Sequence, residues 1–220
     1  MGVSRGEITT RIVKDGLVFN MDAANRASYP RTGTTVTDTI GNTSGTLNSA
    51  TFSNIDSGVF NFDGTDDKID LAGGGQDIGI NSTVSIWVNL DSGYNGILLG
   101  EDGYSFDYLL YPYSTGFYVR IASTALNYSD VPTYLTAGSW HHLAVVRTGD
   151  SIEVFVDGIS RGTNTGFGTS NGIRFDTIGA KPTGTLPLEG KISSIQAYNR
   201  TLSAEEVLYN YNGMKARFGL

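Results

Sequence analysis

Residues 138–158 read GSWHHLAVVRTGDSIEVFVDG, two apolar runs separated by a short polar segment. The runs cover residues 140–147 and 152–156, and both are rich in the β-branched and aromatic side chains that are enriched in strands. The residues between them, Thr148-Gly149-Asp150-Ser151, are turn formers, and Asp157-Gly158 supplies a second turn after the second run. The stretch therefore predicts an antiparallel β-hairpin.

Similar segments lie on both sides of this hairpin. Residues 60–71 read FNFDGTDDKIDL, residues 84–88 read VSIWV, and residues 188–207 read LEGKISSIQAYNRTLSAEEV. With Gly179 and the hairpin, these segments resemble the laminin-G-like, or concanavalin-A-like, family, which closes on a last strand, Tyr-Asn-Arg-x-Leu-Ser and a short helix. The resemblance implies an all-β jelly-roll sandwich and frames most of the chain from about Leu17 to Leu220.

The two ends of the chain carry a narrower resemblance. Residues 15–25 read DGLVFNMDAAN, Ser28-Tyr29-Pro30 follows, and residues 209–220 read YNYNGMKARFGL. These segments resemble virion structural proteins of tailed phages, especially phages of marine cyanobacteria. That group usually has an aromatic residue at the position of Val36, a serine at that of Ile40 and an aromatic residue at that of Lys68. The local contacts that these side chains make in the group need not occur in this chain.

Composition is consistent with one large β domain. The chain has 220 residues, a size that a single sandwich reaches, and its 29 glycines are typical of a protein with many turns. It has no cysteine, which excludes disulfides and thiolate metal sites. We expect an N-terminal arm over residues 1–14 and a laminin-G-like sandwich domain over residues 15–220.

The charge and hydropathy of the chain exclude several kinds of partner. The formal net charge is −7 and the pI about 4.7, whereas binding to nucleic acid needs a clustered basic surface. No segment has the ~18 consecutive apolar residues needed for membrane insertion, and residues 1–14 lack the apolar core of a signal peptide. We therefore expect no nucleic acid partner, no membrane insertion and synthesis in the cytoplasm of a host.

One helix is expected near the end of the chain. Ser203 is a suitable N-cap, Glu206 completes a capping box, and Leu202 can pack on Val207 as a hydrophobic staple. Asn212-Gly213 is expected to end the helix. This pattern predicts a structural helix that covers one end of the sandwich.

Catalytic residues are not expected. Sandwich glucanases place acidic residues two or three positions apart on one strand, because glycosidase carboxylates must lie roughly 5 to 9.5 Å apart. The closest imitation here is Glu153 and Asp157, about 13 Å apart along an extended strand. The two histidines, His141 and His142, are neighbours whose side chains leave opposite faces of a strand, so they cannot act together.

An acidic loop is the candidate metal site. Asp63, Asp66 and Asp67 lie beside Gly64, and carboxylate oxygens suit Ca²⁺, which many laminin-G-like domains bind. The same residues are common turn formers whose side chains cap their own backbone, and this interpretation is favoured. Lys68 follows directly and could neutralise one of the carboxylates. No other cofactor is expected.

Tyrosine is the most unevenly distributed residue type. Eight of the twelve tyrosines fall between positions 94 and 134, and tyrosine suits both sugar stacking and protein interfaces. Some of them could instead line the core, so we expect a mixed set. The candidate contact or glycan face consists of Tyr94, Tyr104, Tyr108, Tyr111, Tyr113, Tyr118, Tyr128 and Tyr134.

The first fourteen residues are the candidate docking arm. Ile8, Ile12 and Val13 are its apolar side chains available for packing on a neighbouring subunit, and an extended arm can join a partner by strand addition. The alternative is that the arm folds back on its own sandwich.

These features and resemblances together predict a non-catalytic virion structural protein of a tailed phage, used as capsid decoration or as a tail or fibre component. Its expected partners are other virion proteins or copies of itself. The alternative is a carbohydrate-binding module that recognises host-surface glycans, and a glycoside hydrolase ranks third.

Overall fold

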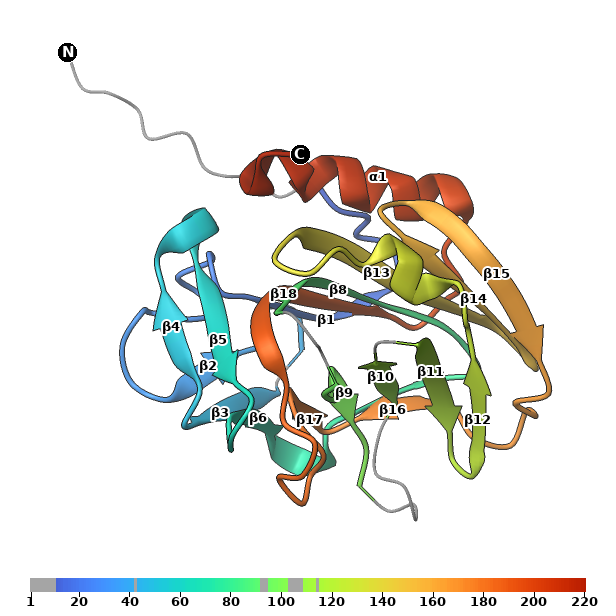
Figure 1. The fold of residues 1–220 in the computed structure, drawn as a ribbon, viewed down its shortest axis with the longest axis horizontal. Helices are drawn as coiled ribbons and strands as arrows, with labels where there is room; N and C mark the ends of the chain where they lie inside the picture. The colour runs from blue at the N-terminus through green and yellow to red at the C-terminus, as the bar shows by residue number, and fades with distance from the viewer. Residues whose placement is uncertain (1–10, 42, 92–94, 103–108, 114) are drawn as a thin grey trace.

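The computed structural model describes residues 11–41, 43–91, 95–102, 109–113 and 115–220. Two large antiparallel sheets stack on each other, and one helix lies on the outside (Figure 1). The first sheet contains β1 (Leu17–Asp22), β4 (Thr51–Ser53), β5 (Val59–Asp63), β8 (Asn81–Leu90), β13 (Trp140–Thr148), β14 (Ser151–Val156), β15 (Ile159–Thr165) and β18 (Glu189–Tyr198). The second contains β2 (Thr35–Thr37), β3 (Ser44–Asn48), β6 (Lys68–Leu71), β9 (Leu99–Gly100), β10 (Leu110–Tyr113), β11 (Gly116–Ile121), β12 (Thr124–Asn127) and β17 (Thr177–Ile178).

The order of the first sheet is β15-β14-β13-β8-β18-β5-β4, and β1 also pairs with β18. The order of the second sheet is β12-β11-β10-β9-β17-β6-β3-β2. A small third sheet pairs β7 (Gln76–Gly79) with β16 (Ile173–Phe175), and four 3-10 turns, η1 (Ile55–Ser57), η2 (Ala72–Gly74), η3 (Val131–Tyr134) and η4 (Lys215–Phe218), connect or end elements. The predicted all-β sandwich with a short C-terminal helix is confirmed.

The hairpin that decides the fold forms as predicted. In β13 and β14, Thr148 pairs with Ser151, so Gly149-Asp150 makes the turn, and Gly149 has a φ of +56°. Asp157 and Gly158 join β14 to β15 with φ values of +54° and +78°. Two consecutive positive φ angles give the type I′ turn that matches the twist of paired strands, which explains the Asp-Gly pair.

Both faces of the first sheet are covered. On β8, Ile86 and Val88 lie in the main core between the sheets, whereas Trp87, with 0% exposure, points to the other side. There it packs with Trp140 and Met214. Trp87 therefore interrupts the alternation of apolar and polar residues along β8, because it places a large apolar side chain on the outer face.

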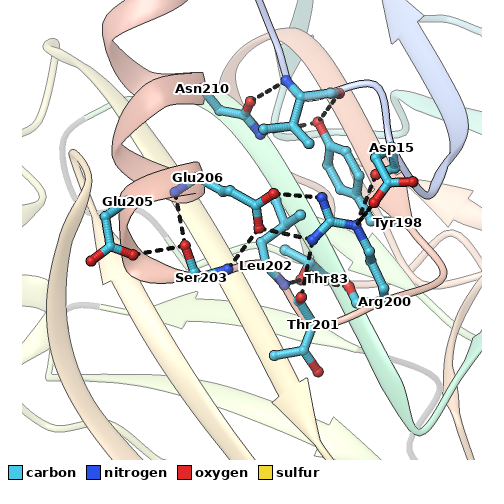
Figure 2. Close-up of polar contacts among 11 residues, drawn as sticks. Asp15, Thr83, Tyr198, Arg200, Thr201, Leu202, Ser203, Glu205, Glu206 and Asn210 are labelled. Carbon is cyan, nitrogen blue, oxygen red and sulfur yellow. Dashed lines mark hydrogen bonds and ion pairs between the residues drawn. The ribbon is translucent and has the colours of Figure 1, made fainter.

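The helix α1 (Ala204–Met214) begins as predicted, with a complete capping box between Ser203 and Glu206. Figure 2 shows this box together with Arg200, whose guanidinium contacts both carboxylate oxygens of Glu206 at 2.6 and 2.8 Å. Leu202 and Val207 lie in one apolar cluster, as a hydrophobic staple requires. The start of the helix is therefore encoded locally.

The expected end of the helix is wrong. The helix continues through Gly213 to Met214, and η4 follows it. A Cβ atom at position 213 would overlap the carbonyl oxygen of Arg11. Glycine is thus placed there because the N-terminal segment passes against the helix, not because the helix stops.

The expected position of the helix also needs correction. The helix lies along the outer face of the first sheet rather than at one end of the sandwich (Figure 1). The reason is that Trp87, Trp140 and Phe155 point outward from this sheet and need an apolar cover.

Within the described residues, no helix has the length and apolar character needed to cross a bilayer.

Residues 11–14 pack on their own domain. Ile12 is buried against Trp87 and Met214. The Val13 amide donates to Oδ1 of Asn210 at 2.7 Å, and the Tyr198 hydroxyl donates to the Val13 carbonyl at 3.2 Å. Of the two possibilities for the arm, folding back describes these residues, so Ile12 and Val13 are not free to dock a neighbour. Ile8 lies outside the described residues.

An ion pair joins the two ends of the chain. Nη1 of Arg217 lies 2.7 Å from Oδ1 of Asp22, and the two side chains are only 9% and 7% exposed. The same guanidinium donates to the carbonyls of Asp56 at 2.7 Å and Gly58 at 2.6 Å. A charge this deeply buried depends on all of these partners.

We predict that Arg217→Ala lowers the free energy of unfolding by about 3–5 kcal/mol, because it leaves the Asp22 carboxylate buried without its partner. Asp15→Ala is the control, since Asp15 also pairs with an arginine but its side chain is 86% exposed. The control should cost less than about 1 kcal/mol in urea denaturation. Similar losses for the two variants would contradict the role given to the Asp22–Arg217 pair.

Candidate functional site

Three of the eight candidate tyrosines meet on the outer face of the second sheet. Phe117 and Val119 point into the core from β11, so Tyr118 between them points outward. Tyr111 on β10 pairs directly with Tyr118, and Tyr113 lies two residues further along β10 on the same face. We call Tyr111, Tyr113 and Tyr118 the tyrosine patch.

The rings of the tyrosine patch are close and nearly parallel. The Tyr113 and Tyr118 rings have centroids 5.2 Å apart and planes 7° apart. The Tyr111 centroid lies 5.7 Å from that of Tyr113 and 6.4 Å from that of Tyr118. The hydroxyls of Tyr113 and Tyr118 are 3.3 Å apart, and the Tyr111 hydroxyl donates to the side-chain oxygen of Asn95. All three rings are half-buried.

Gly116 makes room for this arrangement. It pairs directly with Tyr113, and a Cβ atom at this position would lie 2.6 Å from Cε1 and 2.7 Å from the hydroxyl of Tyr113. The same Cβ would lie 2.5 Å from Oδ1 of Asn127, the atom that accepts the Phe117 amide at 3.1 Å. Gly116 was not among the residues expected at the site, although two residues three positions apart pair directly across a two-residue hairpin turn.

Two further candidate tyrosines, Tyr128 and Tyr134, do not join the tyrosine patch. Tyr128 is buried and donates its hydroxyl to the Ile152 carbonyl at 2.7 Å, so it belongs to the core. Tyr134 is 41% exposed and lies under the guanidinium of Arg161, whose Cζ is 3.5 Å from the ring centroid. The other three, Tyr94, Tyr104 and Tyr108, lie outside the described residues.

The acidic loop brings its three carboxylates together. Asp63, Asp66 and Asp67 each offer an oxygen within 4.8 Å of the others. Lys68 does not neutralise them, contrary to expectation. Its ammonium lies 3.0 Å from Asp70, because residues two apart on β6 share a face, and it donates to the Pro182 carbonyl at 3.1 Å.

The carboxylates of the loop also hold its own backbone. Oδ2 of Asp67 accepts the Asp63 amide, and Oδ1 of Asp63 accepts the Thr65 amide, both at 2.8 Å. Ser49 donates to Asp66 at 3.1 Å. Burial raises the pKa of the Asp67 carboxyl, and the charges of Asp63 and Asp66 add to this rise. The loop borders a hollow of about 390 Å³ that is also lined by Asn61, Phe62, Asp91 and Lys191. These bonds are the ones that the turn interpretation requires.

The histidines lie on opposite sides of β13 and serve different contacts. His141 accepts the Thr136 amide on Nε2 at 3.0 Å, so its Nδ1 carries the proton and donates to Asp157 at 2.8 Å. Both ring nitrogens are therefore engaged. His142 is 1% exposed, and its ring lies 5.3 Å from that of Trp87 under α1. Neither histidine has the exposed, unengaged nitrogen that a general base needs.

Two of the buried groups with strongly shifted pKa values titrate between pH 4 and 7. Burial lowers the pKa of His142 from 6.5 to about 4, although Asp157 partly opposes the shift. Burial also raises the pKa of Glu101 from 4.5 to about 7, with nearby Asp176 and Asp77 adding to the rise and Arg174 opposing it. As the pH falls below 6.5, the unfolded chain binds a proton at His142 and the folded chain does not, so stability is lost toward pH 4. The raised pKa of Glu101 has the opposite effect, because the unfolded chain releases the Glu101 proton between pH 4.5 and 7 while the folded chain keeps it. Stability is therefore lost as the pH rises through this range.

The two stacked antiparallel sheets and the helix on the outer face of the first sheet define the class of β-sandwich proteins. The family model described as the Concanavalin A-like lectin/glucanases superfamily (Laminin_G_3) matches residues 63–208, more than half of the chain. The chain therefore belongs to the concanavalin A-like lectin/glucanases superfamily. No curated protein sequence matches the chain.

Several solved structures share the fold. A Trypanosoma rangeli sialidase in complex with 2,3-difluoro-KDN is 18% identical with a TM-score of 0.66, over 94% of this chain and 34% of the sialidase chain. Domain 4 of AbnA, a GH43 extracellular arabinanase from Geobacillus stearothermophilus, in complex with arabinotriose, is 16% identical with a TM-score of 0.64, over 90% of this chain and 100% of that chain. The binding domain of botulinum neurotoxin serotype D is 14% identical with a TM-score of 0.64, over 90% of this chain and 52% of that chain. This chain thus spans about a third of the sialidase and all of the arabinanase domain, and these likenesses concern the fold.

For the acidic loop we predict that Ca²⁺ raises the melting temperature by less than about 2 °C, because the carboxylates already satisfy the loop backbone. The measurement is a thermal melt with and without Ca²⁺, with Asp66→Ala as the matched variant. A large increase that a chelator reverses and Asp66→Ala abolishes would show that the loop is a metal site.

For His142 we predict that lowering the pH from 7 to 4.5 costs the wild-type protein about 2–3 kcal/mol more than it costs His142→Phe, because only the wild-type protein keeps a neutral histidine buried. Glu101→Gln is the control, because it removes the stability that the protonated Glu101 carboxyl adds as the pH falls. The loss of stability between pH 7 and 4.5 should therefore be larger in Glu101→Gln than in the wild-type protein. Parallel pH profiles for the wild-type protein and His142→Phe would mean that the folded protein protonates His142 normally.

Proposed function

We propose that this chain is a non-catalytic structural protein of a tailed phage virion, displayed as capsid decoration or as a tail or fibre component. The observation that carries the proposal is the contact between the two segments that resemble phage virion proteins. Asp22 of the first segment and Arg217 of the second form the buried ion pair, with 2.7 Å between their charged atoms. The two segments that resemble phage virion proteins therefore contact each other and stabilise the same part of the domain.

The engagement of the acidic residues supports a role without catalysis. Glu153 accepts a hydrogen bond from Ser160, and Asp157 accepts from His141 and from the amide of His142. These two carboxylates are the ones nearest in sequence to a glycosidase arrangement, and each is committed to holding β13, β14 and β15 together. A glycosidase acid needs instead a carboxyl that faces the scissile bond.

A carbohydrate-binding module for host-surface glycans is the second candidate function. The observation that favours it is the tyrosine patch, since aromatic rings at a surface suit sugar stacking. The arabinotriose complex of a domain with the same fold adds support, because that domain matches the chain over its full length. The two candidate functions are compatible, since a displayed virion protein can also bind a glycan.

Attachment to the particle is assigned to residues 1–10. Ile12 and Val13 are used within the domain, so the proposed docking role falls on the part of the arm that precedes them. The proposed partners are other virion proteins or copies of this chain.

We predict that deletion of residues 1–10 leaves the melting temperature nearly unchanged but prevents incorporation into particles in a competition assembly experiment with the full-length chain. Deletion of residues 1–14 is the comparison. It removes the buried Ile12 side chain and should cost about 1.5–3 kcal/mol of stability in addition. Equal incorporation of the shorter deletion and the full-length chain would contradict the role of residues 1–10.

A further inference from the structure

We propose that the tyrosine patch is the binding site for an uncharged saccharide and that Gly116 positions the Tyr113 ring within it. This inference rests on the second candidate function, carbohydrate binding, and assigns it a place and a ligand chemistry. A saccharide ring presents C–H groups on its faces and hydroxyls around its edge. Tyrosine offers the matching combination of an apolar ring with a polar tip.

The geometry of the tyrosine patch is fixed before any ligand arrives. Tyr113 lies over Gly116, its hydroxyl is 3.3 Å from that of Tyr118, and the Tyr111 hydroxyl is bonded to Asn95. The rings of Tyr113 and Tyr118 deviate from parallel by only 7°. Rings held in place by such contacts lose little side-chain entropy when a ligand binds, so the binding free energy is not spent on ordering them.

Polar groups that suit hydroxyls surround the tyrosine patch. Asn127 pairs directly with Tyr118 across β11 and β12, so its side chain lies beside the rings on the same face. Asn95 borders the patch at Tyr111. Carboxamides and phenols both donate and accept hydrogen bonds, as saccharide hydroxyls require.

The charge of the surroundings favours an uncharged ligand. Phenols and carboxamides are neutral at physiological pH. The nearest cation along β11 is Arg120, two residues after Tyr118, and it is only 8% exposed and donates to the Ser123 carbonyl at 3.4 Å. A sialylated or otherwise acidic sugar would therefore find no exposed positive charge on the described residues of the patch.

The size of the tyrosine patch favours a saccharide over a protein. A tyrosine side chain has roughly 150–250 Å² to bury, and each of these three is already half-buried. The area left on these three described rings is well below the roughly 800 Å² that each partner contributes to a stable protein interface. One or two sugar rings fit such an area.

Gly116 is a positioning residue because it sets where the Tyr113 ring lies. Its φ is not among the positive ones, so the backbone there accepts an L side chain. Adding a Cβ atom would bring it within 2.6 Å of the Tyr113 ring and force the ring to move. Gly116→Ala therefore disturbs the patch while it keeps all three tyrosines.

The test is calorimetric titration of the full-length protein with three neutral trisaccharides, arabinotriose, cellotriose and maltotriose, and with the acidic trisaccharide sialyllactose. We expect one or more neutral trisaccharides to bind. Tyr113→Ala and Gly116→Ala should each weaken this binding at least fivefold, whereas Tyr113→Phe, which keeps the ring, should change it less than threefold. Tyr134→Ala is the matched control, because it removes an exposed tyrosine outside the patch and should leave affinity unchanged. Melting curves of all variants show whether each is folded, and the pair Tyr113→Ala and Tyr113→Phe decides the question if Gly116→Ala unfolds.

Each contrary result overturns a distinct part of the inference. Neutral saccharide binding that survives Tyr113→Ala and Gly116→Ala would overturn the site and leave carbohydrate binding standing. Stronger binding of sialyllactose, lost in Tyr113→Ala, would overturn the uncharged ligand chemistry. Failure of all four saccharides to bind would overturn both the inference and the carbohydrate-binding candidate, while the virion proposal would be judged separately by incorporation.

Discussion

The fold depends on the need to cover the outward tryptophans of the first sheet. A face that carries Trp87 and Trp140 cannot be left in water without a large loss of hydrophobic stabilisation. Three segments cover it: α1 through Tyr211 and Met214, the C-terminal turn through Phe218, and the N-terminal segment through Ile12. The Phe218 ring lies 4.3 Å from the Trp87 ring and 4.5 Å from the Trp140 ring, centroid to centroid. The segment around Ile12 and the C-terminal turn are therefore parts of the folded domain.

Local features could be predicted from the sequence, and features that depend on distant contacts could not. The Asp157-Gly158 turn and the Ser203–Glu206 capping box were correctly predicted, since each is decided by residues within a few positions of one another. The end of α1 was wrongly placed because the reason for Gly213 is Arg11, two hundred residues earlier in the chain. The sequence left open whether the arm docks on a neighbour or folds back, because the partners of Ile12, such as Trp87 and Met214, lie far from it in the chain.

The candidate site was predictable only as a region. The high density of tyrosine was visible in the sequence, but the three rings that meet depend on the register that pairs Tyr111 with Tyr118. Tyr128 belongs to the same stretch and nevertheless enters the core, where it bonds to Ile152. The acidic loop shows a similar limit. Its carboxylates were identified as a group, yet the partner of Lys68 was not, because Asp70 competes for it.

The arrangement of the chain ends gives the domain a front and a back. The described N-terminal segment and the C-terminus both lie on the side of α1 (Figure 1). The tyrosine patch lies on the outer face of the second sheet and faces away from the first sheet. A partner bound on the α1 side would hold the molecule by its back, and the aromatic surface would then point away from that partner. Many copies bound through this side would present the same surface in parallel.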